Sequence, residues 1–229
     1  IMAILRKQSL VDQIYDQIRG EIINLEVPLG SRLNVSELQE RYGVSSTPIR
    51  EAINRLQKEG LVEYENNVGA RVISIEENDV IEIQELAMTL HTAAVRFAMK
   101  RGDHQAMADE IHGEIQAYKE AEDYKVKTVC VHNIVGTFYK YCGNSRLDSN
   151  MGVIKGLQLI LRNIYGQAAY GDQEKKLPDN SGDFSALEAA VVRGDTEKVI
   201  EALENNEKKA TPIIVEAVNS QKKKRTGTA

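Results

Sequence analysis

The sequence predicts a mainly α-helical protein with two parts, of which only the first contains β-strands. Residues 8–75 combine helical spacing of apolar residues with two short strand-like runs, whereas residues 78–218 show helical spacing almost throughout. The intervening segment ISIEEND has the composition of a strand end followed by a short linker. We therefore expect a small mixed domain at 8–75, an all-helical domain at 78–218 and a disordered polar tail at 219–229.

Composition and charge place the chain among ordinary globular proteins. It has 229 residues, enough for one large or two small domains, and a net charge of −5. This acidity would discourage non-specific binding to DNA but does not exclude a local basic patch. No apolar run approaches the roughly 20 residues of a membrane span, and the N-terminal residues lack a signal-peptide pattern. We expect a cytoplasmic protein with no membrane partner.

The two cysteines also favour a cytoplasmic location. Cys130 and Cys142 would lie about 18 Å apart along one helix, too far for a disulfide. No CxxC or Cys/His cluster suggests zinc. Free thiols fit a reducing compartment.

The first domain opens with a helix in which apolar residues recur every four positions, at Leu10, Ile14, Ile18 and Ile22. The segment VPLGSRL then breaks the helical pattern with a proline and a glycine.

A second, short helix is expected from Val35 to Tyr42. Asn34 stands three residues before Glu37, a spacing typical of a capping box. Gly43 follows the last turn, where a glycine commonly ends a helix.

The third helix is expected to begin after Ser45, its N-cap, with Pro48 in the first turn and Gly60 at its end. Its inner face would consist of three apolar residues at helical spacing: Ile49, Ile53 and Leu56. Two strand candidates, Leu61–Glu65 and Ala70–Ile73, then flank a turn of sequence Asn-Asn-Val-Gly.

Three helices followed by a hairpin are the order of a winged helix-turn-helix, in which the first turn of the third helix enters the major groove of DNA. Arg50 points away from the inner face and is long enough to bridge O6 and N7 of guanine. Further candidate contacts are the hydroxyls of the first turn, which suit phosphates or base edges, and the wing-tip amides: Ser45, Ser46, Thr47, Asn66 and Asn67. Each residue alone equally fits an ordinary cap or a solvated charge. The combination predicts double-stranded DNA as the partner.

The run VSELQERYGVSSTPIREAINRLQKEGLVEYENNVGARV resembles the GntR family of bacterial transcriptional regulators. Within it, GVSSTPIREAI follows the family's common Gly-Val-Ser-Arg-Thr-Pro-Val-Arg-Glu-Ala-Leu pattern. The resemblance covers about residues 8–75 and implies a repressor or activator that binds a palindromic operator as a homodimer. Family positions that contact DNA match Thr47 and Arg50. Ser46 and Ser36 stand where some relatives have Arg, which implies fewer cationic contacts with the bases.

The second half resembles, more weakly, the all-helical ligand-binding FCD domain of the FadR branch of this family. Three segments carry the resemblance: IQELAMTLHTAAVRFAMKR, VHNIVGTFYKYCGNSRL and ALEAAVVRGDTEKVIEAL. It implies an N-terminal winged helix-turn-helix followed by an FCD-like helical bundle that binds a small-molecule effector, for which an organic acid is one candidate.

Many members of this branch hold a divalent metal with one Asp and three His. Only His132 remains here, because the other positions align with Thr128, Phe184 and about Asn206. The Arg that often binds a carboxylate ligand is replaced by Ala87. Transition-metal sites need three or more protein ligands, so we expect no metal and no cofactor.

Four polar residues of the helical domain are candidate effector contacts: Thr128, His132, Tyr139 and Arg162. His132 equally fits a core histidine bonded to a neighbour. Arg162 lies in the otherwise apolar segment GLQLILRNIY, where it is either the partner of a buried anion or an exposed charge. Two alternatives stay open: a helical domain that only dimerises, and an enzyme, although no catalytic dyad or phosphate loop is visible.

Overall fold

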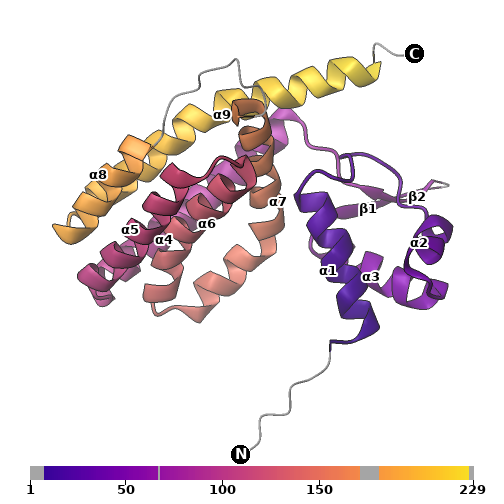
Figure 1. Ribbon diagram of the computed structural model, residues 1–229, viewed down its shortest axis with the longest axis horizontal. Coiled ribbons are helices and arrows are strands. Elements are labelled where there is room, and N and C mark those ends of the chain that lie inside the picture. The colour runs from indigo at the N-terminus through magenta and orange to yellow at the C-terminus, as the bar shows by residue number, and fades with distance from the viewer. Residues whose placement is uncertain (1–7, 67, 171–180, 227–229) are drawn as a thin grey trace, which may run out of the picture. The chain divides into compact units, whose positions relative to one another are not determined.

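The computed structural model describes residues 8–66, 68–170 and 181–226 (Figure 1). The chain divides into two compact units, Ile1–Ile75 and Glu76–Ala229. In the described residues the first unit holds three helices and one two-stranded sheet, and the second holds six helices. The predicted fold class, mainly α with a winged helix-turn-helix followed by a helical bundle, is confirmed.

The first unit consists of helices α1 (Leu10–Ile23), α2 (Val35–Tyr42) and α3 (Ser46–Lys58) and strands β1 (Val62–Glu65) and β2 (Gly69–Val72). The apolar faces expected from the four-residue spacing meet in its core, where these side chains are at most 3% exposed: Ile14, Ile18, Ile22, Ile49, Ile53 and Leu56.

The ends of α2 follow the sequence signals in part. The Asn34 side chain accepts a hydrogen bond from the Ser36 amide at 2.9 Å, as an N-cap should. Glu37, however, binds the Asn34 side-chain amide at 2.9 Å rather than the backbone, so the expected capping box is incomplete. Gly43 ends the helix with φ 65°, a left-handed conformation that glycine adopts without a steric penalty.

Strands β1 and β2 form the wing. They pair antiparallel, with Val62 opposite Val72 and Glu65 opposite Gly69. Arg32, in the segment before α2, forms an isolated bridge to Arg71 and extends the pairing beyond the hairpin. The wing, which follows α3 in the chain, is therefore also paired with the segment that precedes α2.

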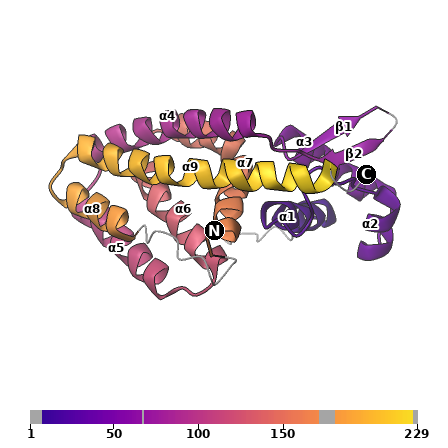
Figure 2. The ribbon, with the colours of Figure 1, turned by 90° about the horizontal axis from the view of Figure 1, so that it is seen from above.

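The second unit is a helical bundle in which α9 runs alongside α4, α7 and α8 (Figure 2). Its main core gathers apolar side chains from α4, α5, α6, α8 and α9. The helices are α4 (Glu77–Arg101), α5 (His104–Glu120), α6 (Tyr124–Tyr141), α7 (Ser145–Tyr170), α8 (Ser181–Val192) and α9 (Thr196–Thr226).

Helix α9 corrects one expectation, the disordered tail from residue 219. The helix continues to Thr226. The segment QKKKR contains good helix formers and no glycine or proline. Asn219 Nδ2 also donates to Glu77 Oε2 at 3.0 Å, and Lys222 Nζ to Glu76 Oε1 at 2.8 Å. Polar composition alone did not distinguish an exposed helix from a disordered tail.

Two smaller findings complete the fold. Cys130 and Cys142 are both buried and free. In the described part of the chain, no helix has the length and apolar character needed to cross a membrane.

Candidate functional site

Helix α3 has two chemically distinct faces. Its inner face is fully buried in the core of the first unit. The opposite face exposes Ser45, Thr47, Arg50 and Asn54, with Ser46 half-buried beside them. Among the described residues, none forms a hydrogen bond or an ion pair with Arg50. An unpaired cation therefore stands at the solvent-facing start of a helix.

The first turn of α3 departs from the usual cap. Ser45 has the extended backbone of an N-cap (φ −71°, ψ 169°), yet its hydroxyl makes no capping hydrogen bond. Pro48 removes one of the two usual capping partners, because it occupies the third helical position and proline has no N–H. The Ser45 hydroxyl is thus not engaged in capping, beside a helix N-terminus that attracts anions.

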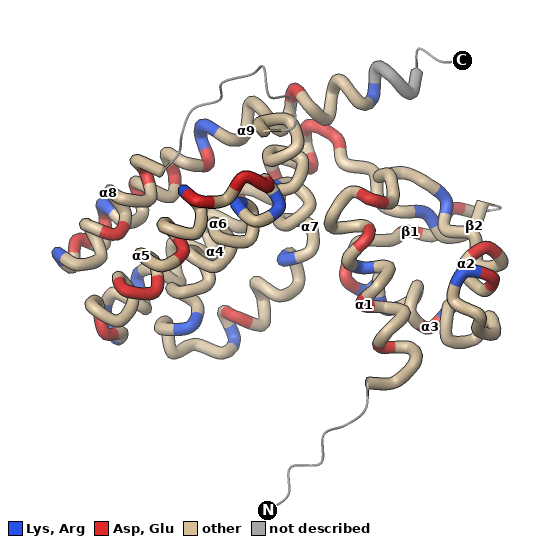
Figure 3. The backbone as a smooth tube through the Cα atoms, viewed as in Figure 1, with Lys and Arg blue, Asp and Glu red and all other residues tan. Residues whose placement is uncertain are grey.

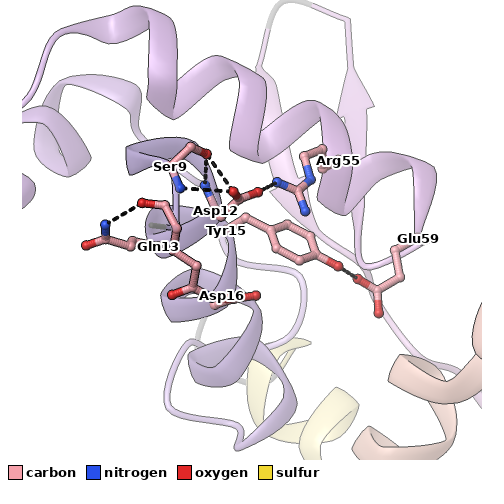
Figure 4. A network of polar contacts seen from close by, with 8 residues as sticks. Ser9, Asp12, Gln13, Tyr15, Asp16, Arg55 and Glu59 are labelled. Atoms are coloured by element: carbon pink, nitrogen blue, oxygen red, sulfur yellow. Dashed lines mark hydrogen bonds and ion pairs between the residues drawn. The ribbon is translucent and has the colours of Figure 1, made fainter. Parts of the chain in front are cut away.

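The other end of α3 is fixed to α1 by a polar network (Figure 4). Tyr15 donates to Glu59 Oε2 at 2.6 Å, and Arg19 Nε donates to Glu59 Oε1 at 2.8 Å. Arg55 pairs with Asp12 at 2.6 Å and lies over the Tyr15 ring at 4.0 Å. Hydrogen bonds from Ser9 and Arg55 lower the pKa of Asp12 to about 2, so this carboxylate stays charged. The network anchors the last turns of α3 and leaves the first turn exposed.

Helix α2 and the wing are tied to the same framework. Arg41 of α2 donates to Glu21 Oε2 of α1 at 2.9 Å. Tyr64 of β1 donates to Asn54 of α3 at 3.3 Å. Ser36 on α2 and Asn66 at the wing tip are exposed, while Asn67 lies outside the described residues. The structure brings the α3 candidates together in one turn and places Ser36 and Asn66 on separate elements.

The second unit encloses a cavity of about 100 Å³, called here the central cavity. Its walls come from helices α4 to α9 and are mostly aromatic or aliphatic. Eight polar or charged residues other than tyrosine also line it: Gln84, His91, Lys127, Thr128, Gln158, Arg162, Asn206 and Glu207. A largely apolar cavity with a few converging polar groups is the usual form of a small-molecule site.

The predicted effector residues divide between two places. Thr128 and Arg162 line the central cavity. His132 and Tyr139 instead line an open groove of about 850 Å³ between α6 and α7. The two spaces share the side chains of His91 and Gln158, so the four candidates do not form one site.

His91 is a buried histidine that sequence analysis did not select. Its Nδ1 lies 3.0 Å from the Tyr139 hydroxyl, and its Nε2 lies 2.7 Å from Gln158 Nε2. Burial, together with the smaller effects of Arg162 and His132, lowers the pKa of His91 to about 3. Burial likewise lowers the pKa of His132 to about 4. Both rings are therefore neutral at pH 7. His91 lies on the buried alanine stripe of α4, a pattern that could have identified it.

Arg162 carries a buried charge, and one of its nitrogen atoms, Nη1, is buried and has no hydrogen-bond partner among the described residues. Burial lowers the pKa of Arg162 to about 10, so the guanidinium remains charged at pH 7. A buried cation is costly unless an anion or an acceptor meets it. Of the two alternatives left by the sequence, burial is the one the structure favours.

Glu207 on α9 lines the same cavity and was missed by sequence analysis. Burial raises the pKa of Glu207 to about 7, although Arg162 acts in the opposite direction. In the described chain the two side chains form no ion pair within 4.0 Å. The signal was available, because Glu207 shares helical spacing with Leu203, Ala210 and Ile214 on the buried side of α9.

The residues at the positions that hold a metal in relatives do not surround a common point here. Thr128, Phe184 and Asn206 line the central cavity, whereas His132 lines the groove. Over the described residues, no group of three or more His, Cys, Asp or Glu side chains is arranged to hold a metal ion.

A trihelical core, a two-stranded wing and an exposed first turn of the third helix define a winged helix-turn-helix protein, here joined to a helical unit with a cavity. Residues 10–72 match the family described as "Bacterial regulatory proteins, gntR family". This match covers the winged helix-turn-helix, the region whose recognition motif carries the resemblance to the family.

The chain is also similar to known transcriptional regulators. The "Probable D-xylose utilization operon transcriptional repressor" of Paenarthrobacter nicotinovorans is 32% identical over 119 residues, which cover 52% of either chain. The chain thus matches about half the length of that relative. The "HTH-type transcriptional repressor GlaR" of Escherichia coli (strain K12) is 24% identical over 213 residues, covering 89% of this chain and 95% of that protein. A solved GntR regulator from Rhodococcus sp. RHA1 shares the fold, with a TM-score of 0.75, 19% identity and coverage of 92% and 99%.

Proposed function

We propose that this protein is a transcriptional regulator that binds DNA through the first turn of α3. The observation that carries the proposal is the exposed, unpaired Arg50 beside the exposed hydroxyls of Ser45 and Thr47, on a helix whose other face is anchored in the core. An arginine in this position suits bidentate binding to guanine, and hydroxyls and amides at a helix start suit phosphate. The match of residues 10–72 to the GntR family model supports the same function.

We propose further that the protein acts as a homodimer on a palindromic operator in the bacterial cytoplasm. One winged domain contacts one half-site, and two-fold symmetry of the protein matches two-fold symmetry of the DNA. Figure 3 shows acidic and basic residues interspersed along the chain. A net charge of −5 keeps non-specific affinity low, so avidity of a dimer would add to specific binding. Catalysis forms no part of the proposal.

A small-molecule effector in the second unit completes the proposed function. The central cavity and the unpartnered Arg162 Nη1 atom support it, because a unit serving only for dimerisation has no need of a buried, uncompensated cation. Control of DNA binding requires that the ligand bind one dimer geometry more tightly than another.

Selection of duplexes from a random pool by the full chain would test DNA binding and define the operator. Arg50→Ala should then weaken operator binding by about 1–3 kcal/mol and relax the preference at one base pair. Lys58→Ala, an exposed cation at the other end of α3, is the matched control and should leave base preference unchanged. If Arg50→Ala keeps both affinity and preference, the proposed recognition surface is wrong.

A further inference from the structure

We propose that the central cavity binds a small monocarboxylic acid with an apolar body, whose carboxylate lies between the guanidinium of Arg162 and a protonated Glu207. The inference rests on the proposed effector role of the second unit and names the chemical class of that effector. Three features of the cavity carry it: apolar walls, a buried cation and a titratable carboxyl group.

The walls select an apolar body. Side chains from helices α4 to α9 line the cavity, and Tyr118 and Phe184 meet edge to face at 5.4 Å between ring centroids. Such walls gain from contact with rings and methyl groups and provide few partners for a polyhydroxylated ligand. The remaining apolar contacts come from Met88, Val131, Leu161 and Ile214. A volume of about 100 Å³ suits a compact aliphatic or aromatic group.

The buried cation selects an anion. Arg162 has a buried Nη1 atom without a hydrogen-bond partner, and a guanidinium presents its N–H groups in the planar geometry that a carboxylate accepts. A bound carboxylate would therefore satisfy a donor and a charge at once. The other cation on the wall, Lys127, already donates to the Tyr118 carbonyl oxygen at 2.8 Å, so a second carboxylate on the ligand would gain less.

The protonation state of the Glu207 carboxyl group controls whether the ligand binds. An ionised Glu207 would repel the ligand, whereas a protonated Glu207 donates its O–H to the ligand carboxylate. The free group has a pKa raised by burial to about 7. A ligand anion beside it raises that pKa further, so binding above pH 7 takes up a proton. Affinity should be level just below pH 7 and should weaken about tenfold for each pH unit above it.

The other titratable groups near the cavity do not reproduce this dependence. His91 on α4 and His132 on α6 have pKa values lowered by burial to about 3 and about 4, so both stay neutral from pH 6 to pH 9. Lys127 on α6 donates to the Tyr118 carbonyl oxygen at 2.8 Å.

The remaining charged groups lie on the helices packed against α9 or on α9 itself. Asp183 on α8 is paired with Lys209 at 2.6 Å. Glu204 precedes Glu207 by three residues and raises the pKa of Glu207, but its effect is smaller than those of burial and of Arg162. Tyr165 and Tyr170 of α7 contribute phenol groups to the wall.

Isothermal titration calorimetry of the full chain without DNA tests the proposal, with isovalerate and benzoate as probes and their amides as neutral isosteres. We expect the acids to bind at least tenfold more tightly than the amides at pH 6.5, and succinate to bind weakly. Titrations from pH 6 to pH 9 in buffers of different ionisation enthalpy should show uptake of about one proton at pH 8.

Variants assign the effect to residues. Glu207→Gln keeps a hydrogen-bond donor and should bind the acids with an affinity that no longer changes across pH 7. Glu204→Gln is the matched control, an exposed carboxylate one turn away, and should keep a pH-dependent affinity whose midpoint lies slightly lower, because Glu204 raises the pKa of Glu207. Arg162→Met should lose most of the preference for acids over amides. If Arg162→Met fails to fold, the Glu207→Gln profile decides.

The proposal is overturned if neither acid binds at millimolar concentration, if amides bind as well as acids, or if Glu207→Gln keeps the wild-type pH profile. Because the titration contains no DNA, such a result leaves the operator selection and the Arg50 test untouched. Conversely, failure of operator binding would leave the ligand titration intact.

Discussion

The two units use charged residues in opposite ways. In the first unit, Glu21 and Glu59 are poorly exposed carboxylates, and each is bound by an arginine, while the unpaired Arg50 faces solvent. In the second unit, the unpaired guanidinium nitrogen of Arg162 is buried beside a cavity. An exposed unpaired cation suits a large polyanion such as DNA, whereas a buried one suits a small anion that can be enclosed. The position of the unpaired charge therefore supports the partner that we propose for each unit.

The largest effect should fall on the first unit alone. Ile53→Ala removes a side chain that is 0% exposed and should lower the free energy of unfolding of this unit by about 2–5 kcal/mol. Amide hydrogen exchange would show lost protection across the first unit and unchanged protection from residue 76 onward. Gln57→Ala, on the exposed face of α3, is the control and should change stability by less than about 0.5 kcal/mol. Equal loss of protection in both units would show that they are not independent.

Two glycines of α7 should respond with opposite signs. A Cβ atom at Gly166 would lie 2.6 Å from Tyr124 Cδ2 and 3.3 Å from Thr128 Oγ1, so Gly166→Ala should cost about 1–3 kcal/mol. A Cβ atom at Gly152 would meet nothing within 4 Å, and Gly152→Ala should stabilise the helix by up to about 1 kcal/mol. Thermal unfolding measures both. Shifts of the same sign would contradict the packing beside the central cavity.

The smallest effect should come from an exposed ion pair of the second unit. Arg96 lies 2.6 Å from Glu197, but the two side chains are 52% and 70% exposed. Arg96→Ala should therefore lower stability by no more than about 1 kcal/mol, and less in high salt. Chemical unfolding at two salt concentrations would test this. A loss above about 2 kcal/mol would mean that solvent does not weaken the pair as expected.

The first unit was largely predictable because its signals are local. Helical spacing, an N-cap before each short helix and Gly43 after α2 are all determined within a few residues, and the bounds of α2 agree with the expected Val35 to Tyr42. The loss of one capping partner for Ser45 also has a local cause, the proline at position 48.

The central cavity depends on packing among distant helices and was predictable only in part. Thr128 and Arg162 were predicted as candidate effector contacts, and both line it. The contribution of Glu207 from α9, and the separation of His132 and Tyr139 into a groove, depend on how α6, α7 and α9 pack. Residue spacing within one helix defines a face but does not determine which other helix that face meets.

The most direct test of the account is operator affinity measured with and without a bound ligand. Fluorescence anisotropy of a labelled operator would follow the full chain with and without a saturating acid that calorimetry shows to bind. The account predicts that the ligand changes the operator Kd by about 5- to 150-fold in the wild type and leaves it unchanged in folded Arg162→Met. If the wild type binds the ligand and its operator Kd does not change, the second unit does not control DNA binding and the central claim is wrong.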